Sequence, residues 1–522
     1  MGGKSGLYIG MIRQTGSTSD ILRDRWGLPV CAVVAGGLLA LALYFVFQGQ
    51  LNADEGFYLL ASRLVRQGFR PYQDFGFTQG PVLPYVNVPW LEIFGYTLDG
   101  LRLTCLAWAL ITVGCGVVWL KRRHSWGAAA LFLVVLTGSP VWVAFVVKGK
   151  TYAFAGLCVL IGTFALLSSR RLWVRWAVFV AAAGLGIGAR YPMAGFFVPA
   201  GLGLLILTPG WKAKLSALAF VVICATIELN VAAAGHWDNF LFWTAQFHRE
   251  ALFQFPISRR IVGCLGYAPG VWVVATWAFV LLARGRAQAR VLALGSLLVA
   301  VVLNVSAPST YSEYVIPFVP AAVLVAVPMI ANLLAARSRA LVLLAVGVLL
   351  TIGWISPPEL TKGILLHAAE AEAFLRDKLP ADSSVVGSMP EIAVAAGMRV
   401  PPSMVMGKFA LTEDYVPEVA QDRMMLTPGM LRKLVADPDT KAVVLSSFAS
   451  WDFSWSVPSY RAVSMESRNM IRSAINQDYQ IAFMNDDYLV FLRKETARSE
   501  GNGAESKASP AGWPQEAQEI HR

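Results

Sequence analysis

The sequence predicts a polytopic α-helical membrane protein with about 11 membrane-spanning helices and a small α/β domain at the C-terminal end. Three observations lead to this fold class. Hydrophobic residues make up 56% of the 522 positions and the mean hydropathy is +0.54, both too high for a water-soluble protein. Apolar runs recur between residues 30 and 355. After Glu359 the composition becomes that of an ordinary soluble domain.

Charge and cysteine usage exclude other classes of protein. The formal net charge is +11, but the basic residues form short clusters between apolar runs, as in cytoplasmic loops of membrane proteins. We therefore predict no nucleic-acid partner. All six cysteines lie within or beside apolar runs, and none forms a Cys-x-x-Cys pair. Neither a disulfide framework nor a zinc site is expected.

The chain begins with polar and basic residues, 1–27, which we predict to be a cytoplasmic tail. The first apolar run, 30–47, has no convincing cleavage site and is predicted to be a spanning helix. A long loop, 52–98, separates it from the rest of the membrane domain, which extends over 28–356. Further spans are predicted at 101–120, 128–147, 152–167, 172–189, 193–207, 215–234, 261–283, 291–305, 314–335 and 341–355.

Basic clusters predict the orientation of these spans. Clusters at 121–123, 170–171, 212–214, 284–290 and 337–339 all fall on one side if the N-terminus is cytoplasmic. The alternate connections, including loop 52–98, then face outward. An odd number of spans also places the C-terminal domain outside the cell membrane, whereas a miscount of one span would reverse its side.

The C-terminal part, 357–495, has the pattern of a small α/β domain. Helical spacing occurs at 370–379 and 428–435, and apolar strand patterns occur at 384–387 and 441–446. Residues 479–484 and 488–493 flank Asn485-Asp486-Asp487, which predicts a hairpin. The tail 496–522 is rich in Ser, Gly, Glu and Pro and is predicted to be disordered.

Acidic and basic residues gather in the outward connections. Loop 52–98 contributes the acids Asp54, Glu55 and Asp74. The cations predicted on the same side are Lys148, Lys150, Arg190 and Arg249. Positive charge on the outer side opposes the usual bias, and a membrane-anchored phosphate would account for it. A carboxylate at the same depth could deprotonate an incoming hydroxyl.

Each of these residues also has a simpler interpretation. Asp54 and Glu55 could form a solvated helix cap, and Asp74 a turn. Lys148 and Lys150 could bind lipid headgroups. Arg190 could form a structural salt bridge. Glu228, a charge within a predicted span, could pair with such a cation. His236 and His248 could form hydrogen bonds at the membrane interface rather than bind a metal.

Several motifs resemble those of a known family. In loop 52–98 they are Asp54-Glu55-Gly56-Phe57-Tyr58, Pro71-Tyr72-Gln73-Asp74 and Gln79-Gly80-Pro81-Val82-Leu83-Pro84-Tyr85. Looser matches are Gly149-Lys150-Thr151-Tyr152, Gly188-Ala189-Arg190-Tyr191-Pro192 and Glu313-Tyr314-Val315-Ile316-Pro317. Together they resemble GT-C class glycosyltransferases, in particular the superfamily of protein O-mannosyltransferases and lipid A aminoarabinose transferases.

The resemblance implies roles for individual residues. Asp54 would be the base toward the acceptor hydroxyl, and Glu55 and Asp74 would orient the acceptor or hold a divalent metal in members that use one. Lys148, Lys150, Arg190 and Arg249 would bind the donor phosphate. The substrate pocket would include Tyr58, Tyr72, Gln79, Tyr152, Tyr191, His248, Glu313 and Tyr314. Relatives often carry Arg-Tyr where Glu313-Tyr314 stands here, which argues against phosphate binding at that position.

The resemblance therefore implies a membrane glycosyltransferase of the bacterial inner (plasma) membrane. It would transfer one sugar, with inversion, from a polyprenyl-phosphate-linked donor to a glycan, lipid or protein acceptor on the extracytoplasmic face. Two alternatives stay open. The chain could be a transporter or lipid-linked-sugar flippase, although transporters favour ionisable groups near the bilayer midplane. It could also be a non-catalytic scaffold, which would leave the outward acids and cations without a purpose.

Overall fold

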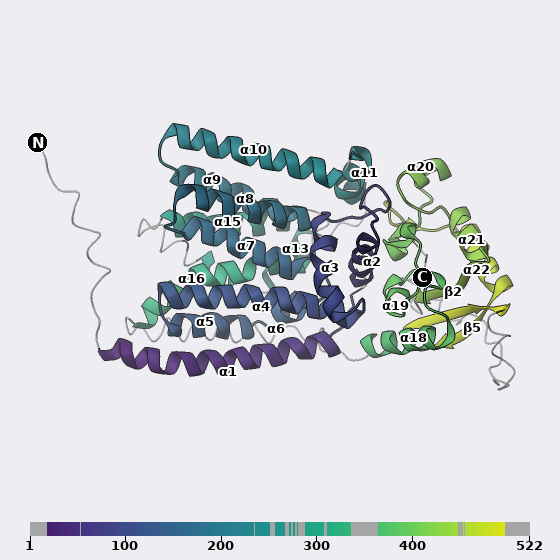
Figure 1. Ribbon diagram of the computed structural model, residues 1–522, viewed down its shortest axis with the longest axis horizontal. Coiled ribbons are helices and arrows are strands. Elements are labelled where there is room, and N and C mark those ends of the chain that lie inside the picture. Colours follow the sequence, from purple (N-terminus) through teal and green to yellow (C-terminus); the bar gives the residue numbers. More distant parts are fainter. Residues whose placement is uncertain are drawn as a thin grey trace, which may run out of the picture.

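The computed structural model describes residues 18–335 and 364–495, except 53, 234, 251–255, 267–270, 273–274, 277–278, 280–287, 307–310, 447–452 and 454. Within this part of the chain, helices that run side by side form a bundle, and a smaller domain lies at one end of it (Figure 1). Helices α2 (Glu55–Arg66) and α3 (Val82–Phe94) lie between the bundle and this domain. A helical membrane body with a C-terminal α/β domain is thus confirmed.

Five helices of the described residues are long and apolar enough to cross a membrane. They are α1 (Thr18–Gln48), whose apolar part is Gly27–Gln48, α4 (Leu98–Arg123), α8 (Leu172–Ala189), α10 (Trp211–Ala233) and α15 (Gln288–Ser306). The other helices of the bundle are shorter: α5 (Trp126–Thr137), α6 (Pro140–Val146), α7 (Tyr152–Leu167), α9 (Ala194–Leu207), α11 (Trp237–Leu241), α12 (Phe247–Glu250), α13 (Ile257–Gly266) and α16 (Val319–Ala335).

The predicted number of spans is not settled by these helices. The span 341–355 and part of the span 261–283 lie outside the described residues. The apolar helices α7, α9 and α16 are shorter than the five helices named above. About eleven spans therefore stays a prediction.

The predicted span 128–147 is bent rather than straight. Helices α5 and α6 meet at an angle of 80° and together could form a sixth span. Pro140 has no backbone N–H and disfavours helical geometry at the residue before it, so the helix stops at Gly138-Ser139. The chain then leaves α6 directly into the Lys148–Thr151 connection, which carries two of the predicted cations.

Side-chain caps set the beginning of two bundle helices. Thr97 accepts a hydrogen bond from the backbone N–H of Gly100 at 3.0 Å where α4 begins. Ser125 accepts one from Ala128 at 3.2 Å where α5 begins. Such caps satisfy N–H groups that have no partner within the helix. The basic residues that end α4, Lys121 to Arg123, suit the negative end of its dipole.

The C-terminal domain is built on a four-stranded mixed sheet with the order β1-β2-β6-β5. The strands are β1 (Ser384–Gly387), β2 (Thr440–Ser446), β5 (Tyr479–Met484) and β6 (Tyr488–Arg493), and a separate two-stranded sheet joins β3 (Trp455–Ser456) to β4 (Arg461–Ala462). The helices are α18 (Ile364–Lys378), α19 (Pro390–Ala395), α20 (Pro417–Asp422), α21 (Pro428–Ala436) and α22 (Met465–Asp478). The predicted hairpin is confirmed, since β5 and β6 pair antiparallel.

Helix α19 of this domain packs against α2, which begins next to Asp54. The contact is close: a Cβ atom at Gly56 would lie 2.1 Å from Glu391 Oε2. A larger residue at this position would force the Glu391 side chain to move. The C-terminal domain is thereby held directly over the first turn of α2.

Candidate active site

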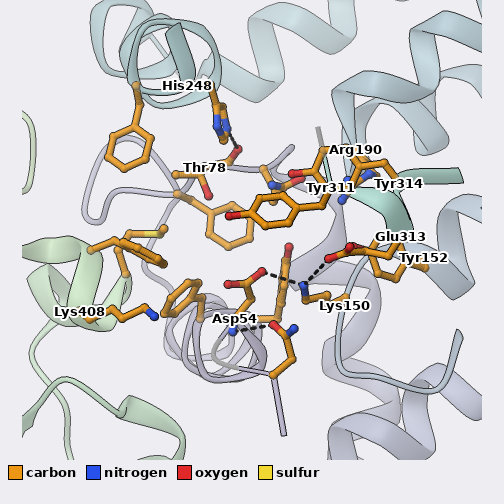
Figure 2. A pocket seen from close by; sticks show the side chains of 18 of the residues that line it. Asp54, Thr78, Lys150, Tyr152, Arg190, His248, Tyr311, Glu313, Tyr314 and Lys408 are labelled. Carbon is orange, nitrogen blue, oxygen red and sulfur yellow. Dashed lines mark hydrogen bonds and ion pairs between the residues drawn. The ribbon is translucent and has the colours of Figure 1, made fainter. Parts of the chain in front are cut away.

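A cavity of about 320 Å³ lies between the bundle and the C-terminal domain (Figure 2). Segments that are distant in the sequence line it: the start of α2, residues 77–79, the α6–α7 connection, the end of α8, residues 247–248, residues 311–314, residues 406–409 and Tyr460. Nine of the residues selected from the sequence lie on its wall: Asp54, Tyr58, Gln79, Lys150, Tyr152, Arg190, His248, Glu313 and Tyr314.

Asp54 precedes the first turn of α2, but its side chain does not cap that helix. Its backbone N–H donates to Asn52 Oδ1 at 3.0 Å, which holds the residue in place. Its carboxylate Oδ2 lies 2.9 Å from Lys150 Nζ. The Asp54 side chain is 38% exposed and the Lys150 side chain only 5% exposed. The carboxylate is therefore the more exposed partner of this pair in the cavity.

Lys150 links two carboxylates. Besides Asp54, its ammonium lies 3.6 Å from Glu313 Oε1 (Figure 2). Burial opposes the charge on Lys150, but the two carboxylates outweigh it and raise the pKa well above the usual lysine value. A permanently charged ammonium is thus fixed beside the acid that faces the cavity.

Arg190 follows the last residue of α8 and is 3% exposed. Its Nη1 donates to Thr151 Oγ1 at 2.9 Å, and the rings of Tyr314 and Tyr152 lie 4.1 and 5.0 Å from its guanidinium carbon. These aromatic faces stabilise the cation and orient it. Among the described residues Arg190 forms no ion pair with a carboxylate, and its buried Nε has no hydrogen-bond partner.

The alternative interpretation of Arg190, a structural salt bridge, is therefore not found in the part of the chain described. Glu228 lines a separate hollow together with Arg70 and Tyr85. A buried guanidinium whose Nε–H has no hydrogen-bond partner is instead suited to bind an anion that enters the cavity.

A second hollow of about 380 Å³ adjoins the first, because Thr78, Gln79, Arg190, His248 and Tyr314 line both. The rest of its wall comes from the start of α9 and the end of α15, both apolar helices of the bundle, together with Tyr191, Pro192 and Thr244. The guanidinium of Arg190 thus stands between a polar cavity and a hollow at the edge of the membrane body.

Glu55 does not line this cavity. It is fully buried in an ion pair with Arg102, with Oε2 2.7 Å from Nη2 and Oε1 2.8 Å from Nε. The backbone N–H groups of Asn52 and Gly149 also donate to it, at 2.8 and 2.7 Å. Burial alone would raise the pKa of Glu55, but Arg102 and these two donors lower it on balance.

Arg102 extends the same network to the end of α1. Its guanidinium donates to the carbonyl oxygens of Phe45, Val46, Gly49 and Gln50. One buried ion pair therefore joins the ends of α1, α2 and α4 to the connection that carries Lys150. Glu55 thus holds together the segments that bear Asp54 and Lys150, whereas the sequence placed it beside them in the pocket.

Other residues selected from the sequence also lie outside the first cavity. Asp74 accepts the backbone N–H of Arg70 at 2.7 Å within a turn, as in its simpler interpretation. Tyr72 is buried and donates to the carbonyl oxygen of Gln79. Lys148 is buried against the ring of Phe145, and Arg249 is exposed on α12.

His248, by contrast, lies on the wall of the first cavity, where Nε2 donates to the Thr78 carbonyl at 3.1 Å.

Solved structures share this architecture. ArnT from Cupriavidus metallidurans bound to undecaprenyl phosphate matches with a TM-score of 0.59 at 14% identity, over 87% of this chain and 97% of that chain. The apo form of the same ArnT matches with a TM-score of 0.56 at 14% identity, over 87% and 96%. ArnT is a GT-C glycosyltransferase. This chain has the GT-C fold.

A further match to the GT-C fold is weaker. The archaeal oligosaccharyltransferase AglB from Archaeoglobus fulgidus, in complex with an inhibitory peptide and a dolichol-phosphate, has a TM-score of 0.48 at 11% identity, over 87% of this chain and 72% of that chain. No protein-family model matches the sequence, and no curated protein matches it significantly.

The C-terminal domain of this GT-C fold contributes cavity residues that were not predicted: Met406, Lys408, Phe409 and Tyr460. They lie in turns of a soluble domain, where lysines and aromatics are common, so no local pattern distinguishes them. Tyr311 and Thr78 were also missed on the other walls. The docking of the C-terminal domain on the bundle, through α19 on α2 and through contacts such as Trp243 with Arg423, brings the domain residues to the cavity.

A divalent metal was expected if the chain resembles metal-using members of the family. The described part of the chain contains no group of three or more His, Cys, Asp and Glu side chains placed to bind a metal ion. Between the carboxylates of Asp54 and Glu313 lies the ammonium of Lys150.

Glu391, at the domain contact, leads to a prediction about pH. Burial raises the pKa of its carboxyl to about 8, and both oxygens are buried without a hydrogen-bond partner among the described atoms. The folded state therefore holds a proton that the unfolded chain releases near the ordinary value of 4.5, so this group lowers stability as the pH rises from about 4.5 to 8. The effect is on the order of a few kcal/mol, at about 1.4 kcal/mol per unit of pKa shift.

We expect Glu391→Gln to raise the melting temperature at pH 9 more than at pH 5, because the glutamine does not ionise. Melting of the purified protein in detergent, followed between pH 5 and 9, measures this difference. Exposed Glu418 on α20 is the matched control, and Glu418→Gln should leave the pH dependence unchanged. Equal pH profiles for wild type and Glu391→Gln would contradict the prediction.

Proposed function

We propose that the protein is an integral membrane glycosyltransferase that transfers a single sugar from a polyprenyl-phosphate-linked donor to a hydroxyl group of a glycan, lipid or protein acceptor. One observation carries the proposal: the partly exposed carboxylate of Asp54 shares a cavity with the buried cations Lys150 and Arg190. This combination supplies a base and a phosphate site within one polar cavity at the end of the membrane body. The GT-C fold supports it.

The donor phosphate would bind at Arg190. The unmet Nε donor and the nearby Lys150 ammonium suit a phosphodiester. The adjoining hollow at α9 and α15 would take the first part of the lipid chain, because it lies beside apolar helices of the bundle. Undecaprenyl phosphate, bound in the ArnT structure, has this combination of a phosphate and an apolar chain.

The proposed reaction has one displacement step. The acceptor oxygen forms a bond to the anomeric carbon as its proton passes to an Asp54 carboxylate oxygen. The bond from that carbon to the phosphate oxygen breaks, and its electron pair leaves with the polyprenyl phosphate. Attack opposite the leaving group inverts the anomeric carbon. Arg190 and Lys150 would stabilise the charge that grows on the leaving phosphate.

We further propose a location in the bacterial inner membrane, in line with the apolar helices of the bundle. The basic clusters of the connections would lie in the cytoplasm, and the cavity with the C-terminal domain on the extracytoplasmic face. Labelling of single cysteines introduced into the C-terminal domain, with a membrane-impermeant thiol reagent on intact cells, tests this orientation. Labelling only after lysis would place the domain in the cytoplasm.

A direct assay tests the proposed reaction. Purified protein in nanodiscs is given a synthetic polyprenyl-phosphoryl sugar and a panel of acceptors, with Mg²⁺ or with EDTA. Release of polyprenyl phosphate together with a glycosylated acceptor supports the proposal, and the EDTA arm decides the metal requirement. A flippase or transporter would move the donor or a solute across vesicles without breaking the glycosidic bond.

Replacement of Arg190 should weaken donor binding. We expect Arg190→Gln to raise the KM for the donor by about 10- to 100-fold, since a charge-assisted hydrogen bond contributes roughly 1.5–3 kcal/mol. Arg190→Lys should recover part of the loss. Arg249→Gln is the control, because Arg249 is exposed and does not line the cavity. A donor KM that responds to Arg249→Gln and not to Arg190→Gln would reverse this assignment.

A further inference from the structure

A third hollow lies at the edge of the membrane body and shares no lining residue with the two hollows described above. Its volume is about 320 Å³, and its wall comes from residues 70–71, the start of α3 and the last two turns of α10. Both helix ends lie at the end of the bundle beside the C-terminal domain (Figure 1). A bound water needs only about 10–15 Å³, so the hollow has room for a larger group.

Glu228 brings a carboxylate to this hollow from within an apolar helix of membrane-spanning length. Its oxygens lie against α8: a Cβ atom at Gly184 would be 2.8 Å from Oε2, and one at Gly188 would be 2.7 Å from Oε1. The two glycines thus leave space for the carboxylate between α10 and α8. Among the described residues Glu228 forms no hydrogen bond and no ion pair. A charge within a membrane helix is costly unless it has a partner.

Arg70 brings a charge of the opposite sign to the same hollow. Its backbone N–H donates to Asp74, but its exposed guanidinium forms no ion pair with any described residue, Glu228 included. Tyr85 of α3 also lines the hollow and is exposed, as tyrosines at a membrane surface usually are. Two opposite charges that share a hollow without pairing suit a ligand that carries both charges.

The surroundings of the hollow are apolar. Val82, Val231 and Ala232 complete its wall together with two prolines. Helix α10 packs against α8 and α11, and of its residues only Ala217 and Ala233 are buried. Most of α10 therefore presents apolar side chains outward, where the acyl chains of a lipid can lie against them. A membrane lipid with both charges in its headgroup is thus the ligand that matches the whole surface.

We propose that this hollow binds the headgroup of a zwitterionic phospholipid whose amine is primary, with its phosphate at Arg70 and its ammonium at Glu228. A guanidinium is well suited to bind a phosphate. A primary ammonium offers three N–H donors to the carboxylate, whereas the quaternary ammonium of a choline headgroup offers none. The bound lipid joins α10 to the start of α3. This site is separate from the candidate active site and goes beyond the proposed function.

The experiment measures lipid binding to the full-length protein in detergent by native mass spectrometry. The probes are dioleoyl phosphatidylethanolamine, its N-methyl and N,N-dimethyl forms, and dioleoyl phosphatidylcholine. We expect the ethanolamine lipid to bind about tenfold more tightly than the choline lipid, with the largest loss at the last methyl group, which removes the last N–H donor. Glu228→Gln should remove most of this preference. Arg70→Gln should weaken binding of all four lipids alike.

Glu92→Gln is the matched control for the loss of an acid. Glu92 lies on α3, where it pairs with Arg66 outside the hollow, so this variant should keep the preference. Equal binding of the ethanolamine and choline lipids by the wild type, or a preference unchanged in Glu228→Gln, would overturn the proposal. Tighter binding of dioleoyl phosphatidylglycerol than of the ethanolamine lipid would also overturn it, because the phosphate alone would then be recognised. The methylation series needs only the wild-type protein, so it decides the matter even where Glu228→Gln does not fold.

Discussion

Replacement of Asp54 with asparagine is expected to slow sugar transfer by about 10²- to 10⁴-fold, the usual contribution of a positioned general base. The amide could still accept a hydrogen bond from the acceptor, but it could not take the proton. Arg190, with its contacts to Thr151 and Tyr314, does not depend on Asp54, and Lys150 keeps its second carboxylate Glu313, so affinity for the donor should change much less than the rate. Single-turnover release of polyprenyl phosphate measures the rate, and competition by polyprenyl phosphate measures donor affinity.

Asp74→Asn is the matched control for this substitution. It makes the same chemical change in the same loop, but Asp74 lies in a turn with Arg70 and outside the cavity. Its turnover should stay close to wild type. Normal turnover by Asp54→Asn, or an equal loss in both variants, would remove the assignment of Asp54 as the base.

Replacement of Glu55 should act mainly on folding. We expect Glu55→Gln to lower the free energy of unfolding by roughly 3–5 kcal/mol, because it leaves the guanidinium of Arg102 buried without its counter-charge. Several carbonyl groups at the end of α1 depend on the position of Arg102, so the loss should extend to the packing of α1. Thermal unfolding in detergent, followed by size-exclusion chromatography, measures it.

Two comparisons separate this effect from a general loss of charge. The double variant Glu55→Gln with Arg102→Met should be more stable than Glu55→Gln alone, since it removes the unpaired charge. Glu92→Gln breaks the exposed pair between Arg66 and Glu92 and should cost less than about 1 kcal/mol. A Glu55→Gln protein that is fully stable but inactive would assign Glu55 to the chemistry instead.

Much of the fold could be predicted from local patterns. Strands β5 and β6 match their predicted ranges, and α8 begins and ends at the predicted residues. Alternating apolar residues in a strand, and an apolar run of bilayer length in a helix, are properties of neighbouring residues. The bend between α5 and α6 was missed because hydropathy is averaged over a window, and one proline hardly changes that average.

The sequence predicted which residues form the candidate site better than it predicted how they are arranged. Asp54, Lys150 and Arg190 were selected because acids and cations gather in the connections predicted to face outward, where positive charge opposes the usual bias, and Glu313 was selected from the family resemblance. The same reasoning selected Glu55, Lys148 and Arg249, which the structure places elsewhere. Arg102 was overlooked because it stands at the edge of a predicted span, although a charge there carries the same signal.

The sequence by itself determined the membrane character of the chain, the α/β nature of its C-terminal domain, and the charged residues available near one end of the helices. These properties follow from hydrophobicity and periodicity, which act over a few turns of chain. Only the tertiary structure decided that Asp54 faces a cavity while its neighbour Glu55 is buried in an ion pair, and that Lys408 joins the wall. The physical reason is that adjacent residues of a helix point in different directions, and packing between distant segments selects the partner of each.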